Sequence, residues 1–460
     1  MSRQIHRALL LGVILLSLES DGFADWRRFR GPNGSGIAEN GPPLPETWTL
    51  TEGTKWKLEL PGRGVSGPIV VGNNVFVTAY SGYGRDQGQI EDLRRHLLCV
   101  DASSGKKIWQ ADIDAVQPED PFSGAGVPSH GYASHTPTSD GERVYVFFGK
   151  SGVLAFDLQG HKLWQTSVGT GSGRQRWGSS ASPVLVGDLV VINASDEAES
   201  LVALDAKTGD ERWRISDPAL ANVWATPVLL DGKLIAAVSG SVWAINPATG
   251  EKLWSVPGPG GNQTNIGPVV DVDGKFIFVQ ASRDGSSVAL VEDGPNAESV
   301  WTSTIQSRYS SPLVVDGHVF AINGDVITCL DARTGERIFQ ERLSGSGQPE
   351  PQVNRGGEAS QERPSEGRGR FGGRRGRGGS GGRGGGGDYP SPVMANGRIY
   401  ILKKSGMVHI VAPEPEFRII GSADMTADTS GFDSTPAISD GKMFVRSETT
   451  LYCIGSRLHR

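Results

Sequence analysis

Short apolar runs separated by tight turns recur along most of the chain. In SPVLVGDLVVIN, which begins at Ser182, a small residue and a proline precede two apolar runs joined by a Gly-Asp turn. Runs of this length, rich in β-branched residues and joined by such turns, are typical of β-hairpins. The leading proline occurs in eight such units, at Pro68, Pro137, Pro183, Pro227, Pro268, Pro312, Pro392 and Pro436.

A second recurrent sequence motif follows most of these hairpins and ends in an aromatic residue. Its fullest form is LVALDAKTGDERW, residues 201–213, with an alanine, an aspartate, a Thr-Gly turn and a tryptophan. The glycine permits the positive φ of a tight turn, and the aspartate can accept bonds from the turn backbone. Related copies begin at residues 97, 153, 242, 287 and 327.

The hairpin and the second motif together give four strands per unit, and most leading prolines lie 41 to 46 residues apart. This period is the signature of a β-propeller blade. The sequence therefore predicts an all-β fold, an eight-bladed β-propeller of four-stranded repeats, as a single domain over residues 25–460.

The final unit lacks a fourth strand. STPAISDGKMFVRSETTLYCIG, residues 434–455, stops before the position of its tryptophan, whereas TKWKLEL, residues 54–60, has the length of a strand and carries Trp56. We expect this N-terminal strand to complete the last blade and close the ring, which removes an exposed sheet edge.

The recurrent tryptophans are expected to dock neighbouring blades. The motif position held by alanine in LVALDAKTGDERW, Ala203, is the alanine slot, and we expect it to be small so that a neighbouring blade's indole can approach. The docking residues are Trp56, Trp109, Trp164, Trp213, Trp254 and Trp301. Cys99, Cys329 and Cys453 occupy the alanine slot of three blades far apart in sequence. Buried filler is the expected role of these cysteines.

The N-terminus has the features of a secretory signal peptide, residues 1–24. Arg3 and Arg7 precede an apolar run over residues 8–18, and small residues lie near Ala24. This run is shorter than the ~20 residues that span a bilayer, so no transmembrane segment is expected. The sequence predicts a periplasmic or secreted protein.

An insertion rich in glycine and arginine, residues 344–388, separates the sixth and seventh units. Residues 367–387 hold six arginines and no acid, in a chain whose formal net charge is -6. This composition predicts disorder. Similar repeats bind RNA, but export favours anionic envelope polymers, acidic lipids, extracellular DNA or the protein's own acidic surface, with no nucleic-acid partner in the cell. A tolerated surface insertion is the alternative.

The tandem A-x-D-x-x-T-G-x-x-x-W motif resembles the pyrroloquinoline quinone (PQQ) repeat. This repeat occurs in quinoprotein dehydrogenases and in the propeller subunit of the outer-membrane β-barrel assembly machinery. The resemblance implies the propeller fold and leaves the function open. In the dehydrogenases, two adjacent cysteines lie over the quinone, and carboxylate and amide side chains hold calcium. This chain has no adjacent cysteines, and its DVDG at 271–274 aligns with ordinary hairpin turns. We expect no cofactor, with PQQ and calcium as the disfavoured alternative.

The loops that enter the first strand of each blade, together with those joining its second and third strands, share one face. This decorated face carries the insertions 81–95, 110–134, 165–181 and 344–388. Three positions before each proline, the chain enters the central channel. The candidate ligand-binding residues there and nearby are His135, Arg176, Trp177, Trp224, Asn265, Arg308, Tyr309, Tyr389 and Asp433. Such aromatic and polar groups suit a sugar or a planar ligand, unless they merely line a wet channel.

Two histidines in PSHGYASHTP, His130 and His135, raise the question of a metal site or a general base. A metal needs three or four converging ligands, and neither histidine has a carboxylate or cysteine companion in sequence. We expect a loop histidine bonded to backbone and no metal. FFGKSG, residues 147–152, resembles the end of a P-loop but has Val144 where the first glycine is required.

These observations favour a monomeric, non-catalytic exported scaffold that binds a protein or an anionic envelope polymer through its decorated face. Catalytic residues are unknown, and whether any catalysis occurs stays open. The alternative is an enzyme that uses the channel, either a quinoprotein-like oxidoreductase or a polysaccharide-active propeller.

Overall fold

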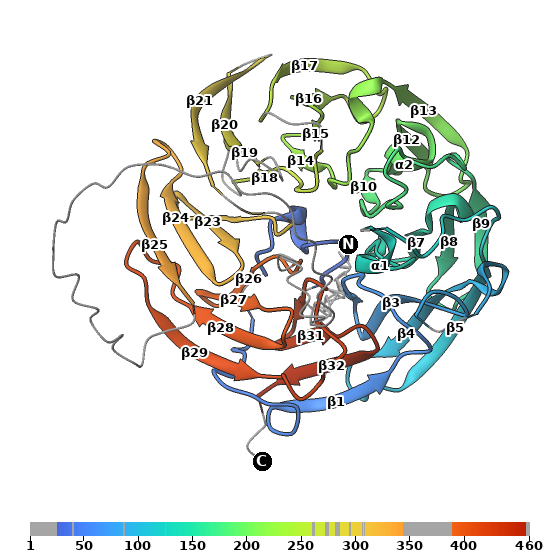
Figure 1. Cartoon of the computed structure of the whole chain (residues 1–460), viewed down its shortest axis with the longest axis horizontal. Coiled ribbons are helices and arrows are strands. Elements are labelled where there is room, and N and C mark those ends of the chain that lie inside the picture. The colour runs from blue at the N-terminus through green and yellow to red at the C-terminus, as the bar shows by residue number, and fades with distance from the viewer. Residues whose placement is uncertain are drawn as a thin grey trace, which may run out of the picture.

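The computed structural model describes residues 25–38, 41–85, 88–124, 126–259, 263–271, 276–280, 286–293, 296–305, 307, 309–343 and 389–456. The expected signal peptide and the Gly/Arg-rich insertion lie outside these residues. Within them, the strands form eight antiparallel sheets of four strands, arranged as blades around a central axis (Figure 1). The predicted eight-bladed β-propeller is confirmed.

Each of the first seven blades takes its strands in chain order from the channel outwards. Blades 1 to 4 consist of β2–β5 (Ile69–Val71, Asn74–Ser81, Arg94–Asp101, Lys107–Asp114), β6–β9 (Thr138–Ser139, Arg143–Phe147, Val153–Asp157, Lys162–Thr166), β10–β13 (Val184–Val186, Leu189–Ala194, Ser200–Asp205, Glu211–Ser216) and β14–β17 (Val228–Leu230, Lys233–Val238, Ser241–Ile245, Lys252–Pro257). Blades 5 to 7 consist of β18–β21 (Val269–Val270, Phe276–Gln280, Ser286–Asp293, Asn296–Thr304), β22–β25 (Leu313–Val315, His318–Asn323, Val326–Asp331, Arg337–Arg342) and β26–β29 (Val393–Ala395, Arg398–Leu402, Met407–Val411, Ile419–Asp424).

Blade 8 closes the ring with strands from both ends of the chain. Its strands are β30 (Ala437–Ser439), β31 (Lys442–Arg446), β32 (Thr450–Gly455) and β1 (Thr54–Glu59). The helical turns are short: η1 (Pro32–Gly34), η2 (Ile90–Asp92), α1 (Val127–His130), η3 (Gly149–Ser151), α2 (Ser195–Ala198) and η4 (Pro218–Leu220).

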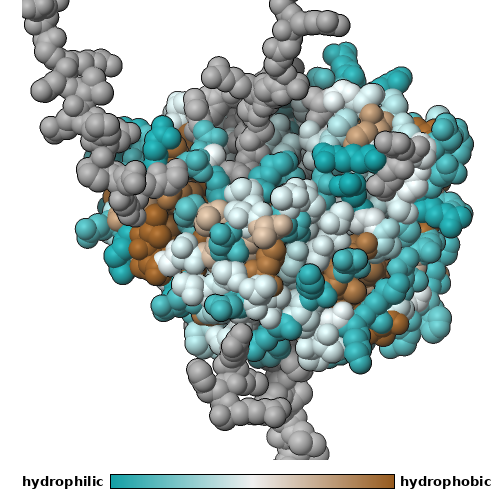
Figure 2. Space-filling view, turned by 60° about the horizontal axis from the view of Figure 1, so that its bottom comes forward, coloured by the Kyte–Doolittle hydropathy of each residue, from teal (hydrophilic) through white to brown (hydrophobic). Residues whose placement is uncertain are grey.

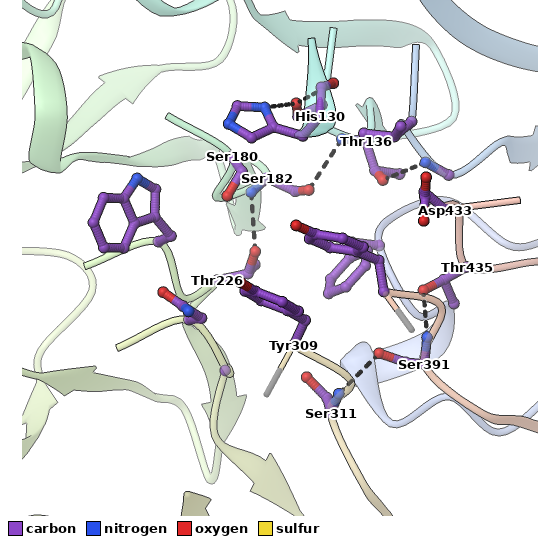
Figure 3. Close-up of a pocket in the computed structure, with 18 of the residues that line it drawn as sticks. His130, Thr136, Ser180, Ser182, Thr226, Tyr309, Ser311, Ser391, Asp433 and Thr435 are labelled. Atoms are coloured by element: carbon purple, nitrogen blue, oxygen red, sulfur yellow. Dashed lines mark hydrogen bonds between the residues drawn. The ribbon is translucent and has the colours of Figure 1, made fainter. Parts of the chain in front are cut away.

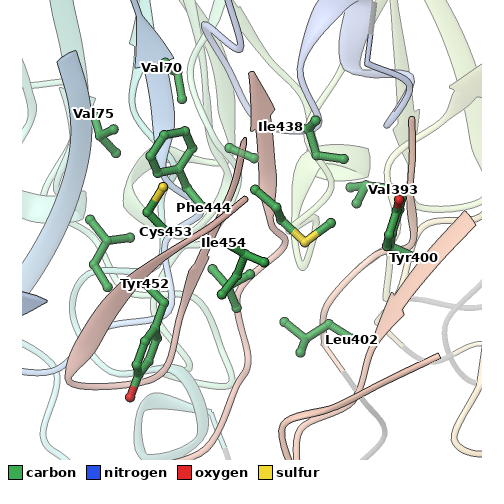
Figure 4. Packing of buried hydrophobic residues seen from close by; sticks show 14 of the residues in the cluster. Val70, Val75, Val393, Tyr400, Leu402, Ile438, Phe444, Tyr452, Cys453 and Ile454 are labelled. Atoms are coloured by element: carbon green, nitrogen blue, oxygen red, sulfur yellow. The ribbon is translucent and has the colours of Figure 1, made fainter. Parts of the chain in front are cut away.

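The N-terminal strand pairs as expected. Strand β1 lies antiparallel to β32, with Trp56 opposite Cys453. Between blades 8 and 1, the fully buried guanidinium of Arg446 donates to the Thr78 carbonyl oxygen at 2.6 Å and to Ser66 Oγ at 3.2 Å. The apolar side chains of blade 8 pack between those of blades 7 and 1 (Figure 4). Both ends of the chain therefore stabilise one blade.

Every outer strand carries a β-bulge where its tryptophan or the equivalent residue lies. A bulge interrupts the hydrogen-bonding edge that another chain could otherwise pair with. Exposed apolar side chains precede this position in five blades, at Ile108, Leu163, Leu253, Val300 and Ile338. Figure 2 shows one face of the molecule, with apolar residues in separate groups among hydrophilic ones.

The docking tryptophans bridge neighbouring blades. Their indole N–H groups donate to carbonyl oxygens of the next blade at 2.8 to 3.1 Å, Trp56 to Ala102, Trp109 to Leu158, Trp164 to Ala206, Trp213 to Pro247 and Trp301 to Ala332. Trp254 instead donates to Glu292 Oε1 at 3.2 Å. The repeat copy in blade 5 lacks the Thr-Gly turn, so a side chain supplies the acceptor there.

The small alanine slot has a different neighbour from the one expected. Strand register places Ala203 opposite Trp213 of its own blade. The turn glycine is the residue that meets the neighbouring indole, because a Cβ on Gly209 would lie 2.6 Å from Trp164 Cδ2. Cys99, Cys329 and Cys453 are free and buried in the alanine slot, as predicted.

Gly209→Ala should therefore destabilise the fold more than Gly232→Ala. Both glycines have positive φ, +77° and +73°, but no atom lies within 4 Å of a Cβ added at Gly232. The control variant carries only the left-handed backbone penalty of ~1–2 kcal/mol. The contact with Trp164 should add ~1–3 kcal/mol at Gly209. Urea denaturation measures the difference, and equal losses of stability would show that the indole contact is unimportant.

The segment between residue 24 and β1 is not part of the repeats. Its described residues, 25–38 and 41–53, form an N-terminal strap, whose turn η1 lies near the centre of the ring in Figure 1. Trp26 N donates to the Val70 carbonyl oxygen in blade 1 at 3.0 Å, and Arg30 Nη2 donates to the Pro312 carbonyl oxygen beside blade 6 at 2.6 Å. The strap thus crosses one end of the channel.

Further along, the strap passes the outer strand of blade 7, which lacks a tryptophan. Thr49 forms a parallel bridge with Asp424, and the buried Trp48 lies 6.3 Å from the Tyr400 ring between centroids. Trp48 therefore adds an indole to the core shared by blades 7 and 8.

Among the described residues, no helix has the length and apolar composition needed to cross a bilayer.

Candidate functional site

Serine or threonine immediately precedes the leading proline in six of the eight blades, whereas Gly67 and Gly267 take this position in blades 1 and 5. The six hydroxyls form a belt at the inner ends of their blades. Five hydroxyls of this belt accept a hydrogen bond from a backbone N–H of the preceding blade (Figure 3). The bonds run from Gly67 N to Thr136, Thr136 N to Ser182, Ser182 N to Thr226, Ser311 N to Ser391 and Ser391 N to Thr435, at 2.9 to 3.0 Å. The belt therefore joins the blades and fixes the hydroxyl positions.

A cavity of about 200 Å³ opens above this belt. All eight residues that stand three positions before the prolines line it, namely Val65, Ser134, Ser180, Trp224, Asn265, Tyr309, Tyr389 and Asp433. Phe29 of the N-terminal strap also lines the cavity. The cavity is thus a channel pocket, open toward the decorated face and reached by the strap from the other end.

Two aromatic pairs form much of the pocket wall. Trp177 and Trp224 lie 5.2 Å apart between ring centroids at an interplanar angle of 30°. Tyr309 and Tyr389 are stacked at 4.3 Å and 10°. Burial, assisted by the neighbouring Tyr309, raises the pKa of Tyr389, so its hydroxyl is neutral. The walls therefore present apolar ring surfaces with neutral polar edges.

His130 lies in the pocket lining, and both of its ring nitrogens have partners. Nε2 lies 2.7 Å from the Trp177 carbonyl oxygen and therefore donates to it, while Nδ1 lies 2.6 Å from Ser134 Oγ. Burial lowers the pKa of His130, which favours the neutral ring. This matches the expected backbone-bonded loop histidine, and His130 positions the Trp177 loop.

The charged groups of the pocket are also paired. Asp433 accepts from Lys404 Nζ at 2.7 Å, and the same ammonium lies 5.7 Å from the centroid of the Tyr389 ring. The carboxylate side chain is almost fully buried, whereas that of Lys404 is half exposed. One carboxylate and one ammonium thus balance each other at the pocket.

The structure brings together six of the nine candidate ligand-binding residues, Trp177, Trp224, Asn265, Tyr309, Tyr389 and Asp433. Arg176 is exposed and does not line the pocket. Arg308 lies outside the described residues. His135 lies in a separate pocket, because alternate residues of an extended chain face opposite sides and its neighbours Ser134 and Thr136 face the channel.

Sequence reasoning missed the hydroxyl belt and Phe29. The small residue before each proline was visible, and its recurrence as Ser or Thr is a signal that points to a shared bonding role. Phe29 gave no such signal, because the strap is not part of the repeat.

His135 belongs to a buried polar cluster between blades 2 and 3. Its Nε2 lies 3.0 Å from Ser179 Oγ, which in turn donates to Glu197 Oε1. The hydroxyl therefore accepts from His135 Nε2–H, and burial lowers the pKa of His135 to about 3. Such a neutral, enclosed imidazole helps to orient its neighbours.

Two carboxyl groups of this cluster lack partners for their outer oxygens. Both side-chain oxygens of Asp196 and Oε2 of Glu197 are buried without a hydrogen bond. Burial raises the pKa of Glu197 to about 8 and that of Asp196 to about 6, the latter assisted by the nearby charge of Asp120. Lys150, 3.4 Å from Asp120, supplies part of the compensating positive charge. Both acids are thus biased toward their neutral forms.

The residues around the channel pocket do not fit a calcium-bound quinone. Calcium takes six to eight oxygen ligands, several of them carboxylates, whereas Asp433 is the single carboxylate among the described lining residues and is paired with Lys404. The three cysteines lie in different blades, so none forms the adjacent pair that covers the quinone in the dehydrogenases. In the part of the chain that the structure describes, no three His, Cys, Asp or Glu side chains converge as a metal site.

Comparison with known proteins agrees with this architecture. The family model described as PQQ_2, outer membrane protein assembly factor BamB, matches residues 51–290 and 238–366. The chain is 25% identical over 294 residues to the outer membrane protein assembly factor BamB of Burkholderia pseudomallei (strain K96243), covering 61% of this chain and 66% of the relative. The match thus spans slightly less than two thirds of that relative.

Solved structures share the fold at low sequence identity. BamB from Moraxella catarrhalis aligns with a TM-score of 0.58 and 13% identity, over 88% of this chain and 98% of that one. A europium-containing methanol dehydrogenase aligns with a TM-score of 0.61 and 11% identity, over 94% and 98%. These likenesses show the fold alone, whereas the family match covers more than half of the sequence. The chain therefore belongs to the PQQ_2 family of outer membrane protein assembly factor BamB.

Proposed function

We propose that this protein is an exported, non-catalytic binding scaffold that engages a protein or an envelope polymer through its decorated face. It acts as a monomeric propeller over residues 25–460, in the periplasm or outside the cell, after removal of residues 1–24. The names of its relatives, outer membrane protein assembly factors, support a role in the envelope with protein partners.

The state of the titratable groups in the channel pocket carries this proposal. Both nitrogens of His130 hold neighbouring groups, and Asp433 is bound to Lys404. General acid–base catalysis needs a group within reach of the substrate that can exchange a proton near neutral pH. Apart from these groups, the described lining offers aromatic faces and neutral polar groups. These groups suit binding without chemical change.

Cosedimentation with an envelope fraction of the producing organism tests the proposal. Wild-type residues 25–460 should sediment with the fraction. Trp177→Ala should reduce retention ~10-fold, because it removes one ring of the Trp177/Trp224 wall of the pocket. Leu163→Ala is the matched control, since it truncates an exposed apolar side chain on the outer strand of blade 2. Equal retention of all three proteins would contradict a role for the decorated face.

Calorimetry with PQQ and calcium provides the second arm. No saturable binding is expected, because the described lining of the pocket offers a single carboxylate, Asp433, and no cysteine. Tight binding at one site per chain would overturn the scaffold proposal and favour the oxidoreductase.

A further inference from the structure

In the part of the chain that the structure describes, the channel pocket can be entered from the decorated face, whereas the opposite end of the channel is crossed by the N-terminal strap. The N-terminal strap crosses the other end of the channel, where Trp26 is bonded to blade 1 and Arg30 to the chain beside blade 6. Phe29 lies between these two anchors and lines the pocket. A polymer cannot thread through such a channel, so only a chain end or a short branch can enter.

The pocket volume limits what enters to one small group. Pockets for drug-sized ligands measure ~300–1,000 Å³, whereas this cavity is about 200 Å³. One ring of a polymer fits this space better than two. The rest of a longer ligand would lie outside, across the decorated face.

The hydroxyl belt provides donors at the inner end of the pocket. Five hydroxyls accept backbone N–H bonds, which hold their oxygens in place, and in the described residues their own protons have no acceptor. Thr136, Ser182 and Thr226 lie next to one another along this ring, with Ser391 and Thr435 on the other side (Figure 3). Fixed donors of this kind suit a ligand with several oxygen acceptors.

The charge of the pocket favours a neutral ligand. Asp433 and Lys404 compensate each other, and His130 is neutral with both nitrogens bonded. A free carboxylate or phosphate would need a cation, and a free amine would need an anion. Among the described lining residues and their partners, either would have to be taken from this pair. A peptide terminus is therefore a poorer match than an uncharged ring.

The aromatic walls of the pocket provide the apolar surface against which a sugar ring could pack. The Trp177/Trp224 pair and the Tyr309/Tyr389 pair offer flat apolar surfaces above the donor belt. The C–H face of a pyranose packs against such rings while its hydroxyl and ring oxygens accept hydrogen bonds. We propose that the pocket holds one uncharged terminal sugar ring of an envelope glycan, an inference that rests on the scaffold function proposed above.

A matched pair of oligosaccharides tests recognition of a chain end. Maltohexaose and α-cyclodextrin contain the same glucose residues and linkages, but only the linear molecule has ends. Linear oligosaccharides of galactose, mannose and N-acetylglucosamine extend the panel, and tryptophan fluorescence with calorimetry follows binding. At least one neutral linear sugar should bind saturably to wild type, with little change in affinity between its disaccharide and longer forms, and α-cyclodextrin should not bind. Absence of binding by every linear sugar would overturn the inference.

Variants then locate the bound sugar. Trp177→Ala should weaken sugar binding ~10-fold, whereas Leu163→Ala should leave it unchanged. Unchanged affinity in both variants, or equal binding of the linear and cyclic sugars, would contradict a terminal ring in the channel pocket.

The envelope fraction separates failure of this inference from failure of the scaffold proposal. Retention that depends on Trp177 but disappears after protease digestion of the fraction would identify a protein partner, so the sugar inference would fall while the scaffold stands. Retention that survives protease and is lost after periodate oxidation of the glycans supports both. Retention unaffected by Trp177→Ala would count against both.

Discussion

Deleting β1, residues 54–59, is expected to remove more than ~5 kcal/mol from the free energy of unfolding. The strand contributes a hydrogen-bonded edge to β32, in which each bond is worth ~0.5–1.5 kcal/mol. It also carries Trp56, whose indole donates to the Ala102 carbonyl oxygen at 3.0 Å and packs on Gly105. A loss of this size equals much of the ~5–15 kcal/mol that stabilises a typical native protein. Urea denaturation followed by far-UV circular dichroism measures it.

Two further variants allow the prediction to be tested even if the β1 deletion variant does not fold. Trp56→Phe removes the indole hydrogen bond and should cost ~1 kcal/mol, leaving the strand in place. Deletion of residues 367–387, within the Gly/Arg-rich insertion, controls for shortening the chain and should leave the unfolding midpoint unchanged. An unaltered midpoint after deletion of β1 would show that the ring does not depend on closure by this strand.

Glu197→Gln should gain stability relative to wild type as the pH rises from 5 to 9. The folded pKa of Glu197 is raised to about 8 from 4.5 by burial, so the folded state keeps a proton that the unfolded state has lost. The associated stability is fully present below pH 4.5 and is lost as the pH rises through about 8. One proton of difference corresponds to a slope of ~1.4 kcal/mol per pH unit. Asp196, with a pKa raised to about 6, contributes in the same direction at lower pH.

Glu199→Gln is the matched control for this pH profile. Glu199 is exposed and lies directly after α2, two residues from Glu197, so its substitution removes the same charge from the surface. In thermal unfolding across pH 5 to 9, the midpoint of Glu197→Gln should rise relative to that of wild type as the pH increases, whereas Glu199→Gln should keep the wild-type profile. Parallel profiles for all three proteins would mean that Glu197 ionises in the folded state as it does in the unfolded chain.

The repeats made the architecture predictable, because each blade encodes its own strands and turns within a short segment. The leading prolines also located the eight channel-lining positions, including Trp224 and Asp433. Spacing alone could not give the direction of each side chain, which is why His135 was grouped with residues on the opposite side of its strand. The same limit applied to the alanine slot, whose indole neighbour belongs to the same blade.

The N-terminal strap could not be predicted, because its role depends on contacts distant in sequence. Arg30 reaches the Pro312 carbonyl oxygen and Trp48 packs near Tyr400, and neither contact follows a local period. The polar cluster around Glu197 was missed for a similar reason. Its members come from separate blade loops, so their shared burial is visible only in three dimensions.

The pairing of Glu59 with Thr450 also determines what a truncated chain would look like. A chain that stops between β29 and β32 contains β1 but lacks the strand that β1 pairs with. Seven complete blades would then accompany an edge strand with unsatisfied backbone groups, and such an edge can pair with a second molecule. Incomplete products of this protein would therefore be prone to aggregate, so correct assembly requires the last strand as much as the first.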